Sequence, residues 1–152
     1  MVPDVCIAAM RVGPVVVPLP RYETHGSAGM DLRAAVAQPL TIPPLGRVRV
    51  PTGLAVAIPQ GFEAQIRPRS GIASKSGVTV LNAPGTVDSD FRGQIEVLLV
   101  NLSDAPAEIE PLDRIAQLVV APVTRVRVDV VATAEALGST QRGDAGFGST
   151  GR

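Results

Sequence analysis

The amino-acid sequence predicts an all-β fold, a sandwich or a jelly roll, with about ten short strands and one short helix. Fifteen glycines and 14 prolines spread through 152 residues are too many for a helical bundle and suit short strands joined by turns. Aromatic residues make up only 3% of the chain, so the core must consist of valine, leucine, isoleucine and alanine. A chain of this length is expected to form one domain with a core large enough to be stable without disulfides or metal ions.

The first third of the chain predicts one edge strand and one buried charge. Residues 1–12 are weakly patterned, whereas residues 15–19 are apolar and contain a proline, which suits an edge strand. Asp31 sits among small and apolar residues, where an unpaired charge is costly, and Arg33 shares its face if this segment is a strand. Either the two residues form a structural ion pair, or the Asp31 carboxylate takes part in a metal site or a polar network. His25, the only histidine, builds no zinc site by itself.

Two further strands are expected before the middle of the chain, and a third follows them. Residues 47–50 alternate strictly, and residues 54–58 are continuously apolar. The Pro-Thr-Gly sequence at 51–53 is expected to split them into separate strands. Residues 62–69 alternate again, with apolar side chains on one face and polar side chains on the other.

Residues 69–77 break the β pattern, and residues 72–76 are expected to form one or two turns of a short helix. Ser70 suits an N-cap, and Gly77 suits the left-handed residue at which a helix stops. Arg69 and the first N–H groups of the helix could meet an anion there. A capped connector helix explains the segment equally well.

Residues 82–97 have the composition of a β-hairpin. A Pro-Gly pair opens the segment, Asp88 to Asp90 form a turn, and an apolar run follows. Backbone groups at such a tip can read the edge of a flat polar ring. The two carboxylates could hold a water or a cation beside Phe91. A plain surface turn is the alternative, because aspartate, serine and glycine are all turn residues.

The C-terminal part predicts two short strands, a last strand and a helical turn. Residues 107–110 alternate, and residues 115–120, in a strand that begins at Arg114, are apolar except for Gln117. A buried amide must be hydrogen-bonded, so Gln117 either ties down backbone or meets a ligand. Residues 125–130 alternate as a last strand, and residues 133–137 suit one helical turn.

The last eleven residues contain four glycines and are typical of a disordered terminus. Two features favour a role for them. Phe147 stands alone among glycines, and Arg142, Ser149 and Thr150 would suit a phosphate. No Gly-Lys-Ser/Thr sequence is present, so this is not a Walker phosphate-binding loop. We expect a flexible lid.

Charge and cysteine content exclude several classes of partner. Fourteen basic and 14 acidic residues give a formal net charge of zero, so no global field attracts nucleic acid or a membrane. Cys6 is the only cysteine, which allows no disulfide within one chain and fits a reducing compartment. No apolar run of about 18 residues occurs, and the N-terminus lacks a signal-peptide core. We expect a cytoplasmic protein.

Five segments together resemble the homotrimeric dUTPase family (dUTP diphosphatases), from about residue 17 to the C-terminus. One motif alone would be weak, whereas five in the right order at compatible spacings are highly specific. They are residues 28–34 (Ala-Gly-Met-Asp-Leu-Arg-Ala), 67–73 (Arg-Pro-Arg-Ser-Gly-Ile-Ala), 82–93 (Asn-Ala-Pro-Gly-Thr-Val-Asp-Ser-Asp-Phe-Arg-Gly), 113–118 (Asp-Arg-Ile-Ala-Gln-Leu), and 142–143 with 146–151.

The resemblance implies a distorted jelly-roll (β-clip-like) barrel that assembles as a homotrimer. Its active sites would lie at subunit boundaries and take residues from all three chains. Residues 1–141 would form the β-domain, and residues 142–152 would form the flexible lid. The implied reaction is hydrolysis of dUTP to dUMP and pyrophosphate with Mg²⁺. This reaction keeps uracil out of DNA and supplies dUMP for dTTP synthesis.

Residue roles follow from the same resemblance. Asp88 would be the general base that holds the attacking water in line with the α-phosphorus. Asp31 would act on Mg²⁺ through a water, with the metal held mainly by substrate phosphates. The residues implied in substrate binding are Arg69, Ser70, Gly71, Asn82, Thr86, Val87, Phe91, Glu96, Gln117, Arg142, Phe147, Gly148, Ser149 and Thr150.

The implied substrate contacts divide by the part of dUTP that they meet. Asn82 and the backbone near Glu96 would pair with uracil, and Phe91 would pack under the deoxyribose. The phosphates would meet Arg69, Ser70 and Gln117. In the lid, Phe147 would stack on uracil while Arg142, Ser149 and Thr150 close over the γ-phosphate.

Three departures from the family pattern stand out. Phe91 occupies a position where the family commonly has tyrosine, so sugar selectivity would loosen slightly. Asp144 and Ala145 replace a small residue and a glycine, which adds negative charge to the lid. Lys75-Ser76 stands where a basic and a bulkier residue are common, and we expect no effect on chemistry.

Two other functions fit the same fold. The first is dCTP deaminase, including bifunctional forms, and the second is a non-catalytic dUTPase-like binding or regulatory protein. The complete glycine-rich tail and Asp88 favour hydrolysis over deamination. Loss of either would have favoured the binding protein.

Overall fold

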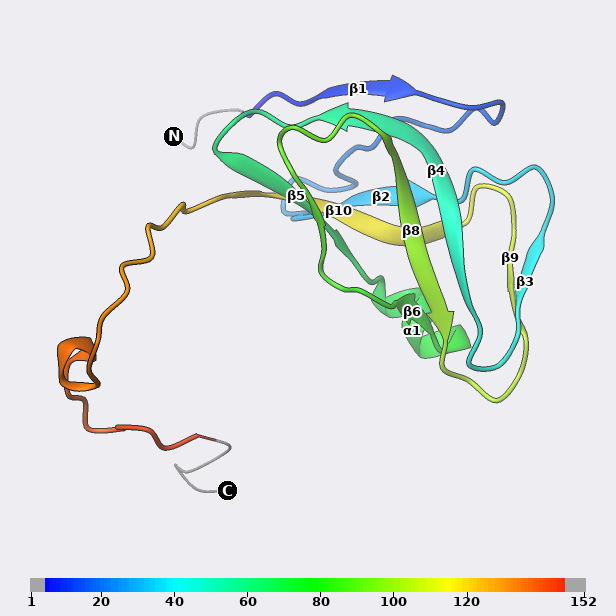
Figure 1. The fold of residues 1–152 in the computed structure, drawn as a ribbon. Helices are drawn as coiled ribbons and strands as arrows, with labels where there is room; N and C mark the ends of the chain where they lie inside the picture. The colour runs from blue at the N-terminus through cyan, green and yellow to red at the C-terminus, as the bar shows by residue number, and fades with distance from the viewer. Residues whose placement is uncertain (1–4, 147–152) are drawn as a thin grey trace.

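The computed structural model describes residues 5–146 and is almost entirely β, which confirms the predicted class (Figure 1). No helix in this part of the chain is long and apolar enough to cross a membrane. The elements in chain order are β1 (Ala8–Arg11), β2 (Met30–Arg33), β3 (Leu40–Ile42), β4 (Arg47–Ala57), β5 (Phe62–Arg67), α1 (Ser70–Ser76), β6 (Val78–Val80), β7 (Gly85–Val87), β8 (Gln94–Asn101), β9 (Ala107–Ile109), β10 (Arg114–Pro122) and η1, a 3₁₀ turn (Glu135–Leu137).

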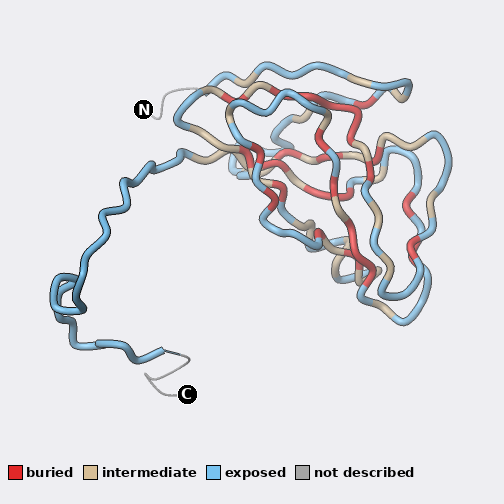
Figure 2. Tube along the Cα trace, in the orientation of Figure 1, coloured by how far each residue is buried: buried red, intermediate tan, exposed pale blue. Residues whose placement is uncertain are grey.

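Two four-stranded antiparallel sheets form the body, in the orders β1-β4-β8-β6 and β2-β10-β5-β7, and β3 pairs with β9 beside them. Their inward faces carry the core, which appears as buried stretches along the strands in Figure 2. Leu32, Leu99 and Leu118 are fully buried. Burying one such side chain stabilises the fold by about 1.5–3 kcal/mol. The core is aliphatic, as the scarcity of aromatic residues predicted.

Strand β4 corrects the prediction of two strands split at residues 51–53. It is one strand of 11 residues that carries an irregularity between Pro51 and Ala55 in its pairing with β8. Gly53 takes a positive φ of 68° there. The Thr52 hydroxyl donates to the Ile95 carbonyl at 2.8 Å. The Pro-Thr-Gly sequence thus forms a bulge within one strand. Gly53 adopts the backbone conformation that the bulge needs, and the Thr52 hydroxyl replaces a hydrogen bond that the bulge removes from the ladder.

The hairpin predicted over residues 82–97 is also corrected. Strand β7 pairs with β5, whereas β8 pairs with β4 and β6, so the segment crosses from one sheet to the other. Gly85 and Val87 are buried against β5, and Ile95 is buried in β8. The two strands therefore bury their apolar side chains as members of different sheets. The turn between them remains, and the Phe91 N–H donates to the Asp88 carbonyl at 3.2 Å.

The predicted edge strand at residues 15–19 is wrong, and the first strand is β1 instead. Strand β1 pairs with β4 from Ala8↔Ala57 to Arg11↔Leu54. Pro18 has no N–H to contribute to a ladder. Val17 is nonetheless buried in the core, and its carbonyl accepts a hydrogen bond of 2.7 Å from Arg11 Nε.

Helix α1 stops as predicted but starts differently. Gly77 has the left-handed conformation (φ 66°), and its N–H donates to the Ala73 carbonyl at 3.1 Å. The N-cap is Arg69 rather than Ser70, and no side chain caps the helix. Ser70 lies inside the first turn, so its hydroxyl is not committed to capping.

Residues 123–146 leave the body as an exposed arm (Figures 1 and 2). The predicted strand at 125–130 does not form, and Val126, Val128 and Val130 are 79%, 82% and 95% exposed. Its alternation lacks a partner strand within this part of the chain. The predicted helical turn is present as η1. A backbone hydrogen bond and the Thr133 side chain lower the pKa of Glu135 in this turn.

Candidate active site

One cavity lies between β7, the turn that follows it, and β8; we call it the base pocket. Six predicted site residues line it: Asn82, Thr86, Val87, Asp88, Phe91 and Glu96. Val87 is buried and Thr86 next to it is exposed, which follows from strand alternation in β7. The structure therefore brings together the residues predicted for the base, the sugar and the attacking water.

Asp88 lies at the start of the turn with its side chain exposed. Within the described residues, no side chain forms a hydrogen bond or an ion pair with its carboxylate. Both carboxylate oxygens can accordingly hold a water. Glu96, in β8, also lines the pocket, and Arg49 Nη1 forms an exposed ion pair of 3.3 Å with its Oε2.

Two residues that sequence reasoning missed hold the turn in shape. Arg92 Nη1 donates to the carbonyls of Ser89 and Phe91, both at 2.7 Å. A Cβ on Gly93 would lie 2.7 Å from Cζ of Phe91, so only glycine leaves the ring in this position. Both belong to the motif of residues 82–93, but the sequence gives no sign of these contacts.

A second cavity lies where β2, β10 and the start of α1 meet; we call it the phosphate cavity. It contains the predicted residues Asp31, Arg69, Ser70, Gly71 and Gln117. Asp31 accepts from Arg69 Nε at 2.7 Å and forms a 3.3 Å ion pair with Arg114 Nη1. The side chains of Asp31 and Arg69 are only 15% and 25% exposed.

The ion pair predicted between Asp31 and Arg33 is wrong. Arg33 Nη1 instead donates to the Leu112 carbonyl at 2.9 Å. Arg33 lies opposite Arg114 in the β2–β10 ladder, and the register shifts immediately after Arg114. Arg69 and Arg114, which are distant in sequence, supply the partners of Asp31.

Gln117 ties down backbone, which confirms the first predicted alternative, and it also lines the phosphate cavity, where contact with a ligand stays a prediction. Its Nε2 donates to the Pro68 carbonyl at 2.8 Å, which joins β10 to the segment before α1. A Cβ on Gly29 would collide with Oε1 of Gln117. Gly29, another residue missed from the sequence, therefore lets Gln117 reach this position.

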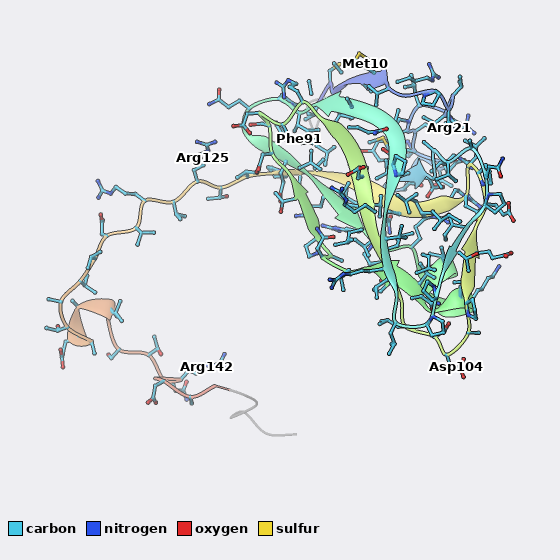
Figure 3. All side chains as sticks on the ribbon, turned by 45° about the vertical axis from the view of Figure 1, so that its right-hand side comes forward. Met10, Arg21, Phe91, Asp104, Arg125 and Arg142 are labelled. Carbon is cyan, nitrogen blue, oxygen red and sulfur yellow. The ribbon has the colours of Figure 1, made fainter. Side chains whose placement is uncertain are left out.

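The two cavities share no lining residue within one chain. Figure 3 shows Arg142 far out on the arm, whereas Phe91 belongs to the body. The remaining predicted lid residues, Phe147, Gly148, Ser149 and Thr150, lie outside the described residues. The described part of a single chain thus separates groups that the sequence assigned to one site.

The fit of a metal ion can be tested on the donors present. In residues 5–146 no three His, Cys, Asp or Glu side chains gather to hold a metal ion. Asp31, the predicted carboxylate, already has a guanidinium on each oxygen. These donors fit only a metal whose ligands come mainly from bound phosphates and water, as is common for Mg²⁺.

The family model of dUTPase matches residues 16–151. This chain belongs to the dUTPase family. The deoxyuridine 5'-triphosphate nucleotidohydrolase of Fusobacterium nucleatum is 54% identical to it over 136 residues, which covers 90% of this chain and 91% of that protein. The corresponding protein of Rhizobium leguminosarum bv. trifolii is 58% identical over 135 residues, or 88% and 85% of the two chains.

Solved structures agree on the fold. The dUTPase of Staphylococcus bacteriophage 80alpha with dUPNHPP has a TM-score of 0.85 at 23% identity and covers 97% of this chain and 99% of that one. A variant dUTPase from phage phi11 of S. aureus, described with a structural Mg(II) ion, has a TM-score of 0.75 at 20% identity and covers 86% and 99%. At these identities the likeness establishes the dUTPase jelly-roll fold alone.

Proposed function

We propose that this chain is a dUTP diphosphatase, which hydrolyses dUTP to dUMP and pyrophosphate. The observation that carries the proposal is the base pocket, where Asp88, Asn82 and Phe91 converge in a member of the dUTPase family. The reaction keeps uracil out of DNA and supplies dUMP for dTTP synthesis. We place the enzyme in the cytoplasm.

Uracil is selected by the edge it presents. Asn82 and Glu96 line the pocket, and the Asn82 amide with the β8 backbone near Glu96 would offer both donors and acceptors. Cytosine presents the opposite pattern on its Watson–Crick edge and would leave buried groups unpaired. A site built to hydrogen-bond one pattern rejects the other strongly for this reason.

Phe91 supports the sugar and excludes ribose. Its ring is 42% exposed and faces the pocket that holds the base. A 2′-hydroxyl would collide with the ring or lose its water without a partner. Gly93 keeps the ring in this place.

Asp88 acts as general base. Its exposed carboxylate accepts a proton from the water that attacks the α-phosphorus in line with the leaving pyrophosphate. A positioned base contributes about 10²–10⁴-fold to the rate. The rest of the acceleration comes from positioning and charge stabilisation, which dominate phosphoryl-transfer reactions.

The phosphate cavity binds the leaving pyrophosphate. Arg69 supplies charge, Ser70 supplies a hydroxyl that caps no helix, and Gln117 contributes an amide fixed by Pro68. Bound Mg²⁺ would neutralise phosphate charge. Asp31 would reach it through a water, because both its oxygens already accept from arginines.

The active enzyme is a homotrimer that combines cavities of different chains. The separation of the base pocket from the phosphate cavity in one chain supports this assembly. So do Val126, Val128 and Val130, because three exposed valines on an alternating segment suit a strand laid on a neighbour. Residues 142–152 then close over the substrate, with Arg142, Ser149 and Thr150 on the γ-phosphate and Phe147 and Gly148 over the uracil.

The deciding experiment measures pyrophosphate release from dUTP, dCTP, dTTP and UTP, each with Mg²⁺ and with a chelator. We expect release from dUTP alone, and loss of activity with the chelator. Ammonia from dCTP without hydrolysis of dUTP would indicate a deaminase. No reaction with any of the four would indicate a binding protein. Sedimentation equilibrium tests the assembly, with an expected mass of three times the 15.7 kDa of one chain.

A further inference from the structure

We propose that Arg114 is a positioning residue that compensates Asp31 and thereby leaves the charge of Arg69 available to the substrate's β- and γ-phosphates. The inference rests on the proposed function and assigns a part in it to a residue that the sequence did not single out.

Arg114 lines the phosphate cavity and contacts both of the other residues. Asp31 Oδ1 accepts from Arg69 Nε at 2.7 Å, and Asp31 Oδ2 lies 3.3 Å from Arg114 Nη1. The Arg114 carbonyl in turn accepts from Arg69 Nη1 at 3.4 Å. Asp31 and the Arg114 backbone together hold the Arg69 guanidinium at the edge of the cavity.

Counting charges shows what Arg114 adds. Asp31 with Arg69 alone is neutral, and the same pair with Arg114 carries one positive charge. Glu23, the other acidic residue lining the cavity, pairs with Arg21 at 3.4 Å. Arg114 is therefore the residue that makes the phosphate cavity attractive to a polyanion. Because Asp31 and Arg69 are largely buried, water screens their charges poorly.

The alternative, a merely structural ion pair, predicts a different outcome. The Arg114 side chain is 47% exposed, and such pairs contribute only about 0–1 kcal/mol to the free energy of unfolding. Its removal would leave the fold intact. A loss of affinity that depends on the β- and γ-phosphates would then have to come from the charge of Arg114 and its effect on the position of Arg69.

The test compares binding of dUPNHPP with binding of dUMP in the full-length protein without metal. In Arg114→Gln we expect dUPNHPP to bind about tenfold more weakly and dUMP to bind as in the wild type. Arg114→Lys keeps the charge and should stay within about threefold of the wild type for dUPNHPP. Asp31→Asn/Arg114→Gln restores the single positive charge and should recover part of the lost affinity. Arg114→Gln and Arg114→Lys should keep the wild-type thermal unfolding midpoint.

Each other outcome overturns a definite claim. Unchanged dUPNHPP binding in Arg114→Gln, or an equal loss for dUMP, removes the assigned role. If the double variant binds dUPNHPP no more tightly than Arg114→Gln, the explanation by the net charge of the cavity is wrong. A wild-type protein that binds neither ligand contradicts the proposed function itself, which separates the two failures.

Discussion

The base pocket and the phosphate cavity are built in opposite ways. The base pocket takes its predicted residues from one stretch, from Asn82 to Glu96, and contains one aromatic ring, that of Phe91. The phosphate cavity takes Asp31, Arg69 and Arg114 from three distant segments and holds them by ion pairs. In the proposed function, shape and hydrogen-bond pattern give selectivity in the first, whereas charge gives affinity in the second. Changes in each should therefore alter different measured quantities.

Asp88→Asn should have the largest effect and should separate chemistry from binding in the base pocket. We expect kcat to fall about 10²–10⁴-fold because asparagine cannot take the proton from water. Binding of dUPNHPP should persist, since the amide is nearly the same size as the carboxylate. Single-turnover kinetics and equilibrium binding measure the two. Full activity of this variant would refute the assigned base.

A chain that ends at Gln141 tests whether the two cavities suffice without the lid. We expect it to keep the oligomeric state of the full chain and to lose about a hundredfold in kcat/KM for dUTP, because closure positions the phosphates. Sedimentation and steady-state kinetics are the measurements. Undiminished hydrolysis would show that the cavities need no lid.

Gly29→Ala should impair the phosphate cavity alone. The added methyl must displace the Gln117 amide and break its hydrogen bond to Pro68. We expect KM for dUTP to rise about tenfold, the cost of one ordinary hydrogen bond, with dUMP binding unaffected. Gly26→Ala is the matched control, since nothing lies within 4 Å of its added carbon. If KM for dUTP is the same in the two variants, Gln117 has no part in binding the phosphates.

Gly93→Ala should have the smallest effect and should change only how well the base pocket distinguishes dUTP from UTP. The methyl would push the Phe91 ring, which is exposed enough to yield. We expect the preference for dUTP over UTP, as a ratio of kcat/KM values, to fall about threefold. Gly26→Ala again serves as control. A shift in KM without a shift in the ratio would contradict the assignment of Phe91 to the sugar.

Sequence alone determined what depends on neighbours along the chain. The alternation in β5, the stop of α1 at Gly77, and the gathering of Asn82, Asp88 and Phe91 all follow from spacing within one segment. The motifs also identified the family. These features are local, because side-chain direction in a strand repeats every two residues whatever the strand pairs with.

Only the tertiary structure decided which segments pair. Residues 85–87 and 94–101 look like the arms of a hairpin but join different sheets, and Asp31 pairs with Arg69 and Arg114 rather than with Arg33. Residues 125–130 alternate like a strand but find no partner in the described part of the chain. Pairing depends on the registers and bulges by which distant strands bury their apolar faces together. No local spacing encodes that arrangement.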